Sequence, residues 1–165
     1  MYFGETRLDA AAGAAGVERM HGQGEWRATA SGPSERYVGE FVDDAFDGEG
    51  TYYGPTTATA ATATATATAT AMNGGGGGRG SGATFQGRWR RGQFHGAGCY
   101  THEDGSAEVG RYEDGRDVGA GARWLPDRSR AWRLVDGQQA GEIPLDEAAA
   151  IADTLGLPVP PSATD

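Results

Sequence analysis

A short phrase built from glycine and aromatic residues occurs twice in tandem between Phe85 and Trp124. The first copy opens with Phe85-Gln86-Gly87-Arg88-Trp89 and the second with Glu108-Val109-Gly110-Arg111-Tyr112. The copies lie 23 residues apart, from Gly87 to Gly110, and in each copy the first glycine precedes a Gly-x-Gly pair by nine residues. A fixed period of this kind predicts a small structural unit that is completed by its neighbour in the chain.

Each copy has the pattern of a β-hairpin. Alternating residues such as Phe85, Gly87 and Trp89 have the period of a strand. Gly92 and Gly115 lie between the two strands of their copies, where glycine can adopt the positive φ of a tight turn. Glycines inside a strand also leave room for an aromatic side chain from the adjacent strand, so the pattern predicts how the units pack.

The first copy resembles the MORN (membrane occupation and recognition nexus) repeat nearly residue for residue from Phe85 to Gly105. The resemblance rests on aromatic-x-Gly-x-Trp, on Gly-x-x-His-Gly-x-Gly-x-Tyr and on the Asp-Gly turn that follows. The second copy differs at two positions, with Glu108 at the opening aromatic and Val118 in place of His95. The resemblance implies an array of β-hairpins and an adaptor role in cytoskeletal or membrane-associated assemblies, in some cases as a dimer.

Two further units precede these copies. The unit from Tyr37 to Tyr52 keeps the spacing of nine residues between its glycines. The unit from Tyr2 to Trp26 has eighteen, which places an Ala-Gly-rich insertion in its hairpin loop. Such insertions are tolerated because the entropy of loop closure grows only slowly with length. Because a repeat begins at residue 2 without a preceding cap, we expect upstream repeats outside this sequence.

The other segments differ in composition. Residues 55–82 hold an alternating Ala-Thr tract and a run of five glycines, which predicts a disordered insertion. Leu145 to Leu155 has apolar residues at helical spacing, and we expect this helix to cap the array.

The predicted fold is therefore an elongated all-β repeat, a single sheet of tandem hairpins with a C-terminal capping helix. Its segments are residues 1–54 (two units), 55–82 (insertion), 83–125 (two units), 126–157 (terminal hairpin and helix) and 158–165 (tail).

Composition limits the classes of function. The chain has 23 acidic residues, 14 arginines and a net charge of -9, which argues against nucleic acid as a partner. Residues 79–135 are the exception, with ten arginines and seven acids. A single cysteine, the absence of a secretory signal and the lack of a long apolar run predict a cytoplasmic protein. The cytoskeleton and membranes are its candidate sites of association.

Candidate catalytic and metal-binding residues are few. His95, Cys99 and His102 are close in sequence, but a zinc site needs four ligands and a Cys-His pair needs a third, orienting group in a cleft. The acidic residues between Asp43 and Glu49 lack the spacing of a calcium loop. The glycines from Gly74 to Gly78 are not followed by the Gly-Lys-Ser/Thr of a phosphate loop. We therefore predict no enzyme activity, no metal and no cofactor.

Two binding functions remain. In the first, aromatic residues along one face form a groove for a protein segment or for a second copy of the array. The residues of this candidate groove are Tyr37, Phe41, Phe85, Trp89, Tyr100, Tyr112 and Trp124. In the second, guanidinium groups hold the phosphates of anionic lipids. The residues of this candidate patch are Arg88, Arg90, Arg91 and Arg111. Interleaved acidic residues also fit an ordinary solvated turn, so we favour a non-catalytic protein scaffold over a membrane adaptor.

Overall fold

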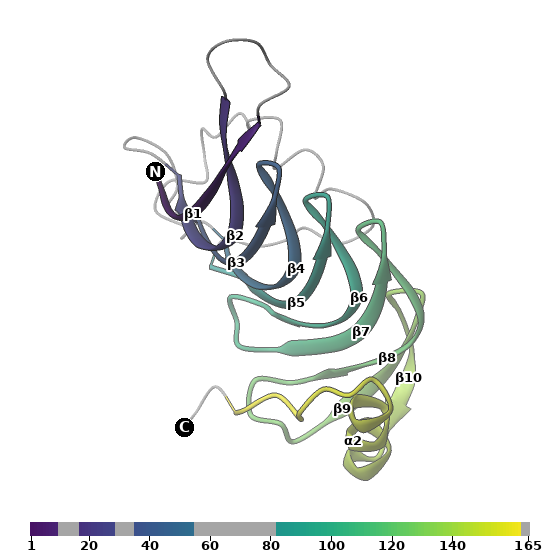
Figure 1. The fold of residues 1–165 in the computed structure, drawn as a ribbon. Helices are drawn as coiled ribbons and strands as arrows, with labels where there is room; N and C mark the ends of the chain where they lie inside the picture. Colours follow the sequence, from purple (N-terminus) through teal and green to yellow (C-terminus); the bar gives the residue numbers. More distant parts are fainter. Residues whose placement is uncertain (10–16, 29–34, 55–81, 163–165) are drawn as a thin grey trace.

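A computed structural model describes residues 1–9, 17–28, 35–54 and 82–162 of the chain. In these residues ten strands form one antiparallel sheet in which each strand lies beside its neighbours in sequence (Figure 1). A helix, α2 (Leu145–Thr154), follows the last strand. The strands are β1 (Tyr2–Asp9), β2 (Val17–Arg27), β3 (Arg36–Val42), β4 (Ala45–Tyr53), β5 (Thr84–Arg90), β6 (Gln93–Thr101), β7 (Ala107–Glu113), β8 (Arg116–Trp124), β9 (Ala131–Val135) and β10 (Gln138–Ile143). This architecture confirms the predicted all-β repeat with a capping helix.

The sheet is continuous across the low-complexity segment. β4 pairs with β5 from Gly48 opposite Trp89 to Tyr53 opposite Thr84, so the second and third units are neighbours in space. Apart from Gly82, the predicted disordered insertion lies outside the described residues. The Ala-Gly-rich insertion between β1 and β2 also lies outside them.

The hairpin turns of the last four β-hairpins share one backbone geometry. Two consecutive residues with positive φ form each turn, which matches the twist of the flanking strands. The pairs are Asp43 and Asp44, Arg91 and Gly92, Asp114 and Gly115, and Asp136 and Gly137. Each turn also contacts the preceding hairpin, as where the Gly92 N–H donates to the Phe46 carbonyl oxygen at 2.8 Å. The turns therefore help to fix the spacing of successive units.

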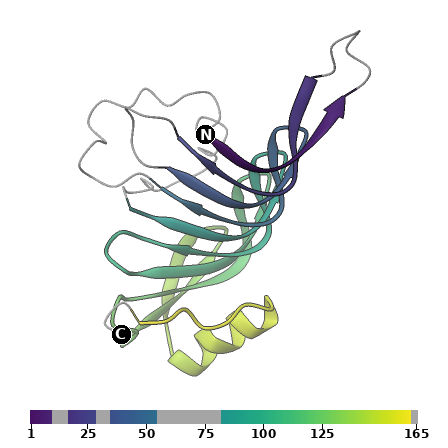
Figure 2. The same ribbon diagram turned by 60° about the vertical axis from the view of Figure 1, so that its left-hand side comes forward.

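A bulge in the second strand bends each of the four repeat hairpins. Between the pairs Gly87–Gly98 and Trp89–Phe94, for example, β6 carries two more residues than β5. Bulges bend and twist a strand, and the resulting hairpins are strongly curved (Figure 2). A glycine with positive φ lies in every one of these bulges, at Gly22, Gly48, Gly96 and Gly119.

Facing glycines lie beneath an aromatic ring in the first three units. Gly39 is opposite Gly50, and Gly87 is opposite Gly98. A Cβ atom added to Gly87 would come within 2.6 Å of the Gly98 Cα atom, and one added to Gly98 within 2.4 Å of the Phe85 ring. The glycines are required because the facing backbone and the ring occupy the space that their side chains would need. This arrangement confirms the packing predicted from the glycine and aromatic pattern.

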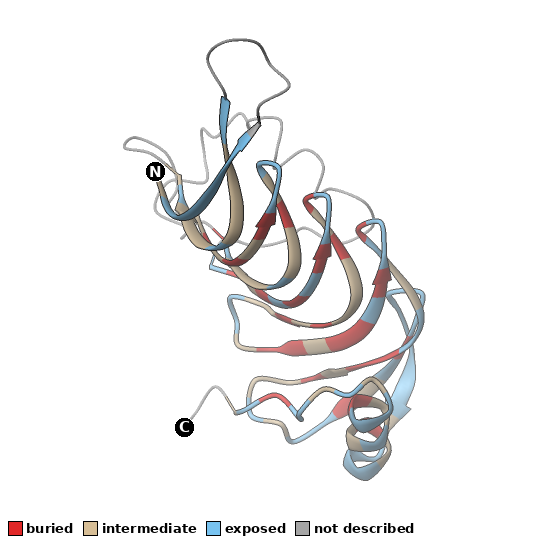
Figure 3. Cartoon of the chain, in the orientation of Figure 1, coloured by how far each residue is buried: buried red, intermediate tan, exposed pale blue. Residues whose placement is uncertain are grey.

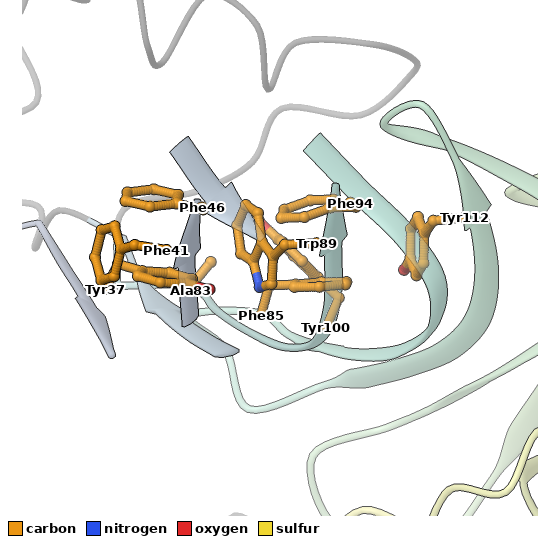
Figure 4. Close-up of a cluster of buried hydrophobic side chains, with 9 residues drawn as sticks. All are labelled: Tyr37, Phe41, Phe46, Ala83, Phe85, Trp89, Phe94, Tyr100 and Tyr112. Atoms are coloured by element: carbon orange, nitrogen blue, oxygen red, sulfur yellow. The ribbon is translucent and has the colours of Figure 1, made fainter. Parts of the chain in front are cut away.

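Two hydrophobic clusters lie on opposite faces of β7. Because β7 pairs with β6 without a bulge, its alternate residues point to opposite faces. Tyr112 belongs to a cluster in the hollow of the curved hairpins, on what we call the aromatic face (Figure 4). Val109 belongs to the second cluster, on the opposite face. Buried residues lie on β3 to β9, whereas β1 and β10 are mostly exposed (Figure 3). The first cluster is Tyr37, Phe41, Phe46, Ala83, Phe85, Trp89, Phe94, Tyr100 and Tyr112, and the second is Val109, Ala122, Trp124, Ala131, Ala148 and Ala152.

The helix α2 covers the second cluster at the C-terminal end of the sheet. Ala148 and Ala152 are fully buried against β8 and β9. Asp146 and Glu147 lie in its first turn, where carboxylates interact favourably with the helix dipole. Among the described residues, no helix is both long enough and apolar enough to span a membrane.

Arg128 fixes the chain that follows α2, a contact that the sequence analysis does not anticipate. Its guanidinium donates to the carbonyl oxygens of Pro160 at 3.1 Å and Pro161 at 2.5 Å. It also donates to the carbonyl oxygens of Gly105 at 3.0 Å and Leu125 at 2.5 Å. Arg128 thus ties together the β6–β7 connection, the β8–β9 connection and the C-terminal segment.

Candidate interaction surfaces

The aromatic residues predicted to line a groove are almost completely buried. The exposed fractions of Tyr37, Phe41, Phe85, Trp89, Tyr100, Tyr112 and Trp124 lie between 0 and 6 %. The bent hairpins bring rings of neighbouring strands together, so that Phe85 stacks on Phe94 with centroids 3.7 Å apart. The expectation of an open groove lined by these residues is therefore corrected: six of them form the core of the aromatic face. Trp124 belongs to the cluster covered by α2.

Three other aromatic residues lie at the margin of this core. Tyr2, Trp26 and Tyr52 are partly buried and pack against it. They are in register with the buried rings, since Trp26 is opposite Tyr37 and Tyr52 is opposite Phe85. We call this row of side chains across neighbouring strands the aromatic row. Its members are Tyr2, Trp26, Tyr37, Tyr52, Phe85 and Tyr100.

Sequence reasoning missed Trp26 and Tyr52, although the repeat pattern marks both. Each closes a Gly-x-Gly-x-aromatic segment, at the position that Tyr100 has in the third unit. Unlike Tyr100, they keep part of their surface exposed. Together with Tyr2, they place the accessible part of the aromatic row on β1, β2 and β4.

Charged residues continue the row beyond Tyr100. Glu108 is opposite Tyr100, and Arg123 is opposite Glu108. The Glu108 carboxylate lies 2.9 Å from His102 Nε2 and 3.2 Å from the Arg123 guanidinium. The aromatic surface thus ends at β6, and an internally paired cluster of charges follows it.

Burial raises the pKa of two tyrosine hydroxyls of the row, those of Tyr37 and Tyr52. It raises the pKa of Tyr37 well above the ordinary value, and the carboxylates of Glu40 and Asp47 act in the same direction. The Tyr37 hydroxyl donates to the Glu40 carbonyl oxygen at 3.1 Å. Burial likewise raises the pKa of Tyr52, with a further contribution from the Glu35 carboxylate. Both groups are therefore neutral hydrogen-bond donors near neutral pH.

The arginines of the predicted anion-binding patch lie away from the aromatic row. Arg88 and Arg90 alternate with buried residues of β5, and Arg111 does so on β7, so these three occupy the opposite face. Arg91 lies in the β5–β6 turn. Arg88 pairs with Glu49 at 2.7 Å, which balances its charge. No acidic side chain of the described residues forms an ion pair with Arg90, Arg91 or Arg111.

The remaining charged side chains form small ion-pair clusters, such as Arg7 and His21 around Asp43, and Arg27 and Arg36 around Glu25. His95 Nδ1 lies 3.8 Å from the Asp114 carboxylate, and Asp43 pairs with Arg7 at 3.2 Å. Burial raises the pKa of the Cys99 thiol, which disfavours the nucleophilic thiolate. Within the described parts of the chain, no group of three or more His, Cys, Asp or Glu residues is arranged to hold a metal ion.

Comparison with protein families identifies two of the units. The model of the MORN repeat matches residues 37–58 and 85–107, which cover all but the first residue of the β3–β4 and β5–β6 hairpins. The comparison with curated proteins gives no match for the chain. The family match confirms the resemblance seen in the sequence.

We expect the Tyr37→Phe variant to lose stability at neutral pH and to resist alkaline unfolding. Removing the buried hydroxyl and its hydrogen bond lowers the free energy of unfolding by about 1 kcal/mol at pH 7. Above about pH 10 an unfolded tyrosine ionises, whereas the folded Tyr37 keeps its proton, so wild-type stability falls as pH rises. The variant lacks this titration, and its stability falls less steeply.

Urea unfolding between neutral and alkaline pH measures both effects. Tyr53→Phe, at an exposed position on the next strand, is the matched control. The same alkaline slope for wild type and Tyr37→Phe would show that the Tyr37 hydroxyl is not held in its neutral form.

Proposed function

The chain carries MORN repeats, and we propose that it is a non-catalytic scaffold that binds a protein segment along its aromatic face. Repeats of this family are typical of binding and scaffold proteins. One observation carries the proposal: Trp26 and Tyr52 keep part of their rings accessible above a buried aromatic core. Aromatic residues that are accessible but held in place are the kind that contribute most to protein interfaces.

The aromatic row suits an extended ligand that lies across the strands. Its members stand in register on successive strands, which are about 4.8 Å apart, so a crossing segment would meet the rings in sequence. Trp26 packs edge to face on Phe46, and Tyr52 on Trp89, with centroids 5.8 and 6.1 Å apart. Because these contacts fix the rings before binding, little side-chain entropy remains to be lost.

Charge favours one class of partner segment. Residues 1–54 carry ten acids and four arginines, and Glu35 lies beside the Tyr52 hydroxyl. A segment that combines apolar side chains with Lys or Arg would complement both the rings and the negative charge. The proposed ligand is therefore an extended, apolar and basic protein segment.

Panning a library of random peptides displayed on phage against the immobilised full chain tests this proposal. We expect enrichment of peptides rich in apolar and basic residues, with affinity reduced at least tenfold by Trp26→Ser or Tyr52→Ser, since buried aromatic anchors dominate such contacts. Tyr53→Ser is the matched control because Tyr53 alternates with Tyr52 and points to the opposite face. Failure to enrich peptides, or equal binding by Trp26→Ser at retained folding, would remove the proposal.

A peripheral membrane adaptor is the second candidate function. It rests on the exposure of Arg90, Arg91 and Arg111 without ion pairs to described acidic residues. Such guanidinium groups can bind phosphate oxygens of anionic lipids, each contributing about 1 kcal/mol near a charged surface. The net charge of -9 and the Arg88–Glu49 pair oppose this function, which is why it stands second.

Co-sedimentation with vesicles of phosphatidylserine and phosphatidylcholine tests the membrane function. If the patch binds lipid, sedimentation with anionic vesicles is lost on raising the salt concentration and in the variant Arg90→Ser/Arg91→Ser/Arg111→Ser. Replacing Arg116, Arg130 and Arg133 by serine removes the same charge elsewhere and serves as the control. Co-sedimentation that changes neither with salt concentration nor in the patch variant would exclude this mechanism.

A further inference from the structure

The chain turns back along the sheet after α2, on the face opposite the aromatic face (Figure 2). Leu157 packs in the second cluster, which also contains Cys99 of β6 and Val109 of β7. Pro160, three residues further on, is buried as well. Residues 157–162, which we call the proline segment, therefore fill an apolar site on this face.

The proline segment has the sequence Leu-Pro-Val-Pro-Pro-Ser, which favours the polyproline II helix. Proline fixes φ near about −65°, and the residue before a proline prefers extended backbone. This helix repeats every three residues, so Leu157 and Pro160 share one edge, and Pro158 and Pro161 share another. Burial follows these edges, because Leu157 and Pro160 are partly or fully buried, whereas Pro158 and Pro161 are exposed. The site thus contacts one edge of an extended segment.

Arg128 supplies the polar contacts to the proline segment. Its guanidinium donates to the carbonyl oxygens of Pro160 at 3.1 Å and Pro161 at 2.5 Å. In the part of the chain that the structure describes, no carboxylate lies within ion-pair distance of this guanidinium. A guanidinium has only donors, and the backbone of consecutive prolines has only acceptors, so the two are chemically matched. The site therefore suits a segment whose backbone offers carbonyl oxygens and few N–H groups.

Few contacts hold the proline segment once it leaves α2. The Leu157 N–H donates to the Ala152 carbonyl oxygen at 2.9 Å. Three of the next four residues are prolines, which lack an N–H, and the Val159 N–H donates no hydrogen bond to any described residue. Residues 158–161 can therefore leave the site without unpairing a strand or unwinding the helix.

We propose that this site binds proline-rich protein segments of the pattern apolar-x-x-Pro-Pro in the polyproline II conformation. The chain's own proline segment occupies the site, and a matching segment of a partner protein displaces it. A tethered ligand competes at an effective concentration on the order of 1 mM, so the partner segment must bind more tightly than the chain's own. The site lies opposite the aromatic face and does not depend on the proposed function of that face.

Fluorescence anisotropy of a labelled peptide, Leu-Pro-Val-Pro-Pro-Ser, titrated with the full chain tests the proposal. The variant Leu157→Asp/Pro160→Asp displaces the chain's own segment by placing charges on its buried edge. We expect this variant to bind the peptide about tenfold more tightly than wild type, because the tethered competitor is removed. Pro158→Asp/Val159→Asp adds the same charges at exposed positions and should bind as wild type does.

Arg128 and the buried edge of the peptide provide the tests of specificity. Adding Arg128→Gln to the Leu157→Asp/Pro160→Asp variant should weaken peptide binding about tenfold, because two carbonyl oxygens lose a charged donor. The peptide Asp-Pro-Val-Asp-Pro-Ser should not bind. Urea unfolding verifies that each variant is folded. No binding by the folded Leu157→Asp/Pro160→Asp variant, or binding that Arg128→Gln leaves unchanged, would overturn the proposal.

A spin label at residue 162 tests displacement while residues 157–161 keep their natural sequence. In a Cys99→Ser background, Ser162→Cys carries the label, and the unlabelled peptide Leu-Pro-Val-Pro-Pro-Ser is added at about 5 mM, above the effective concentration of the tethered segment. We expect the lines of the electron paramagnetic resonance spectrum to narrow, because the released segment moves more freely. Unchanged lines, or the same narrowing with the peptide Asp-Pro-Val-Asp-Pro-Ser, would contradict the exchange.

Discussion

The fold depends on an aromatic ring lying over a pair of facing glycines. Phe85 lies over Gly98 and Tyr37 lies over Gly50, in each case closer than any side chain on the glycine would allow. A bulge with a positive-φ glycine bends the strand next to this contact. Bending closes the hairpin around the rings, which explains how a single-layer sheet can bury large aromatic residues almost completely. The repeat unit is thus defined by steric room as much as by hydrophobicity.

The fourth unit shows what happens when the ring is absent. Glu108 stands at the aromatic position, and a Cβ atom added to Gly110 would meet only the Asp117 Oδ1 atom at 3.9 Å. The aromatic core ends at Tyr112 on β7, and burial moves to the other face, where α2 packs on Ala122 and Trp124. The aromatic face is therefore the candidate binding surface of the first units. The last units instead serve to end the array.

The sequence predicted the elements better than it predicted the surfaces. Period and glycine spacing placed the hairpins, and helical spacing with an acidic first turn placed α2, because these features act through local geometry. The exposure of the aromatic side chains was not predicted. Trp89 and Tyr112 are buried because curvature joins rings from separate strands. Trp124 stands one position after Arg123, which continues the aromatic row, so it points to the opposite face and packs in the cluster that α2 covers. The Arg128 contacts join segments more than twenty residues apart, which no local pattern encodes.

The most direct test of this account compares alanine at two equivalent glycines. Gly87→Ala brings a Cβ atom to 2.6 Å from the Gly98 Cα atom, whereas Gly110→Ala has open space, and neither glycine has a positive φ. Urea unfolding should show that Gly87→Ala loses about 1–3 kcal/mol or more, as expected for overpacking, while Gly110→Ala stays within about 0.5 kcal/mol of wild type or gains stability. Equal losses at the two positions would contradict the claim that the ring over facing glycines holds the repeat together.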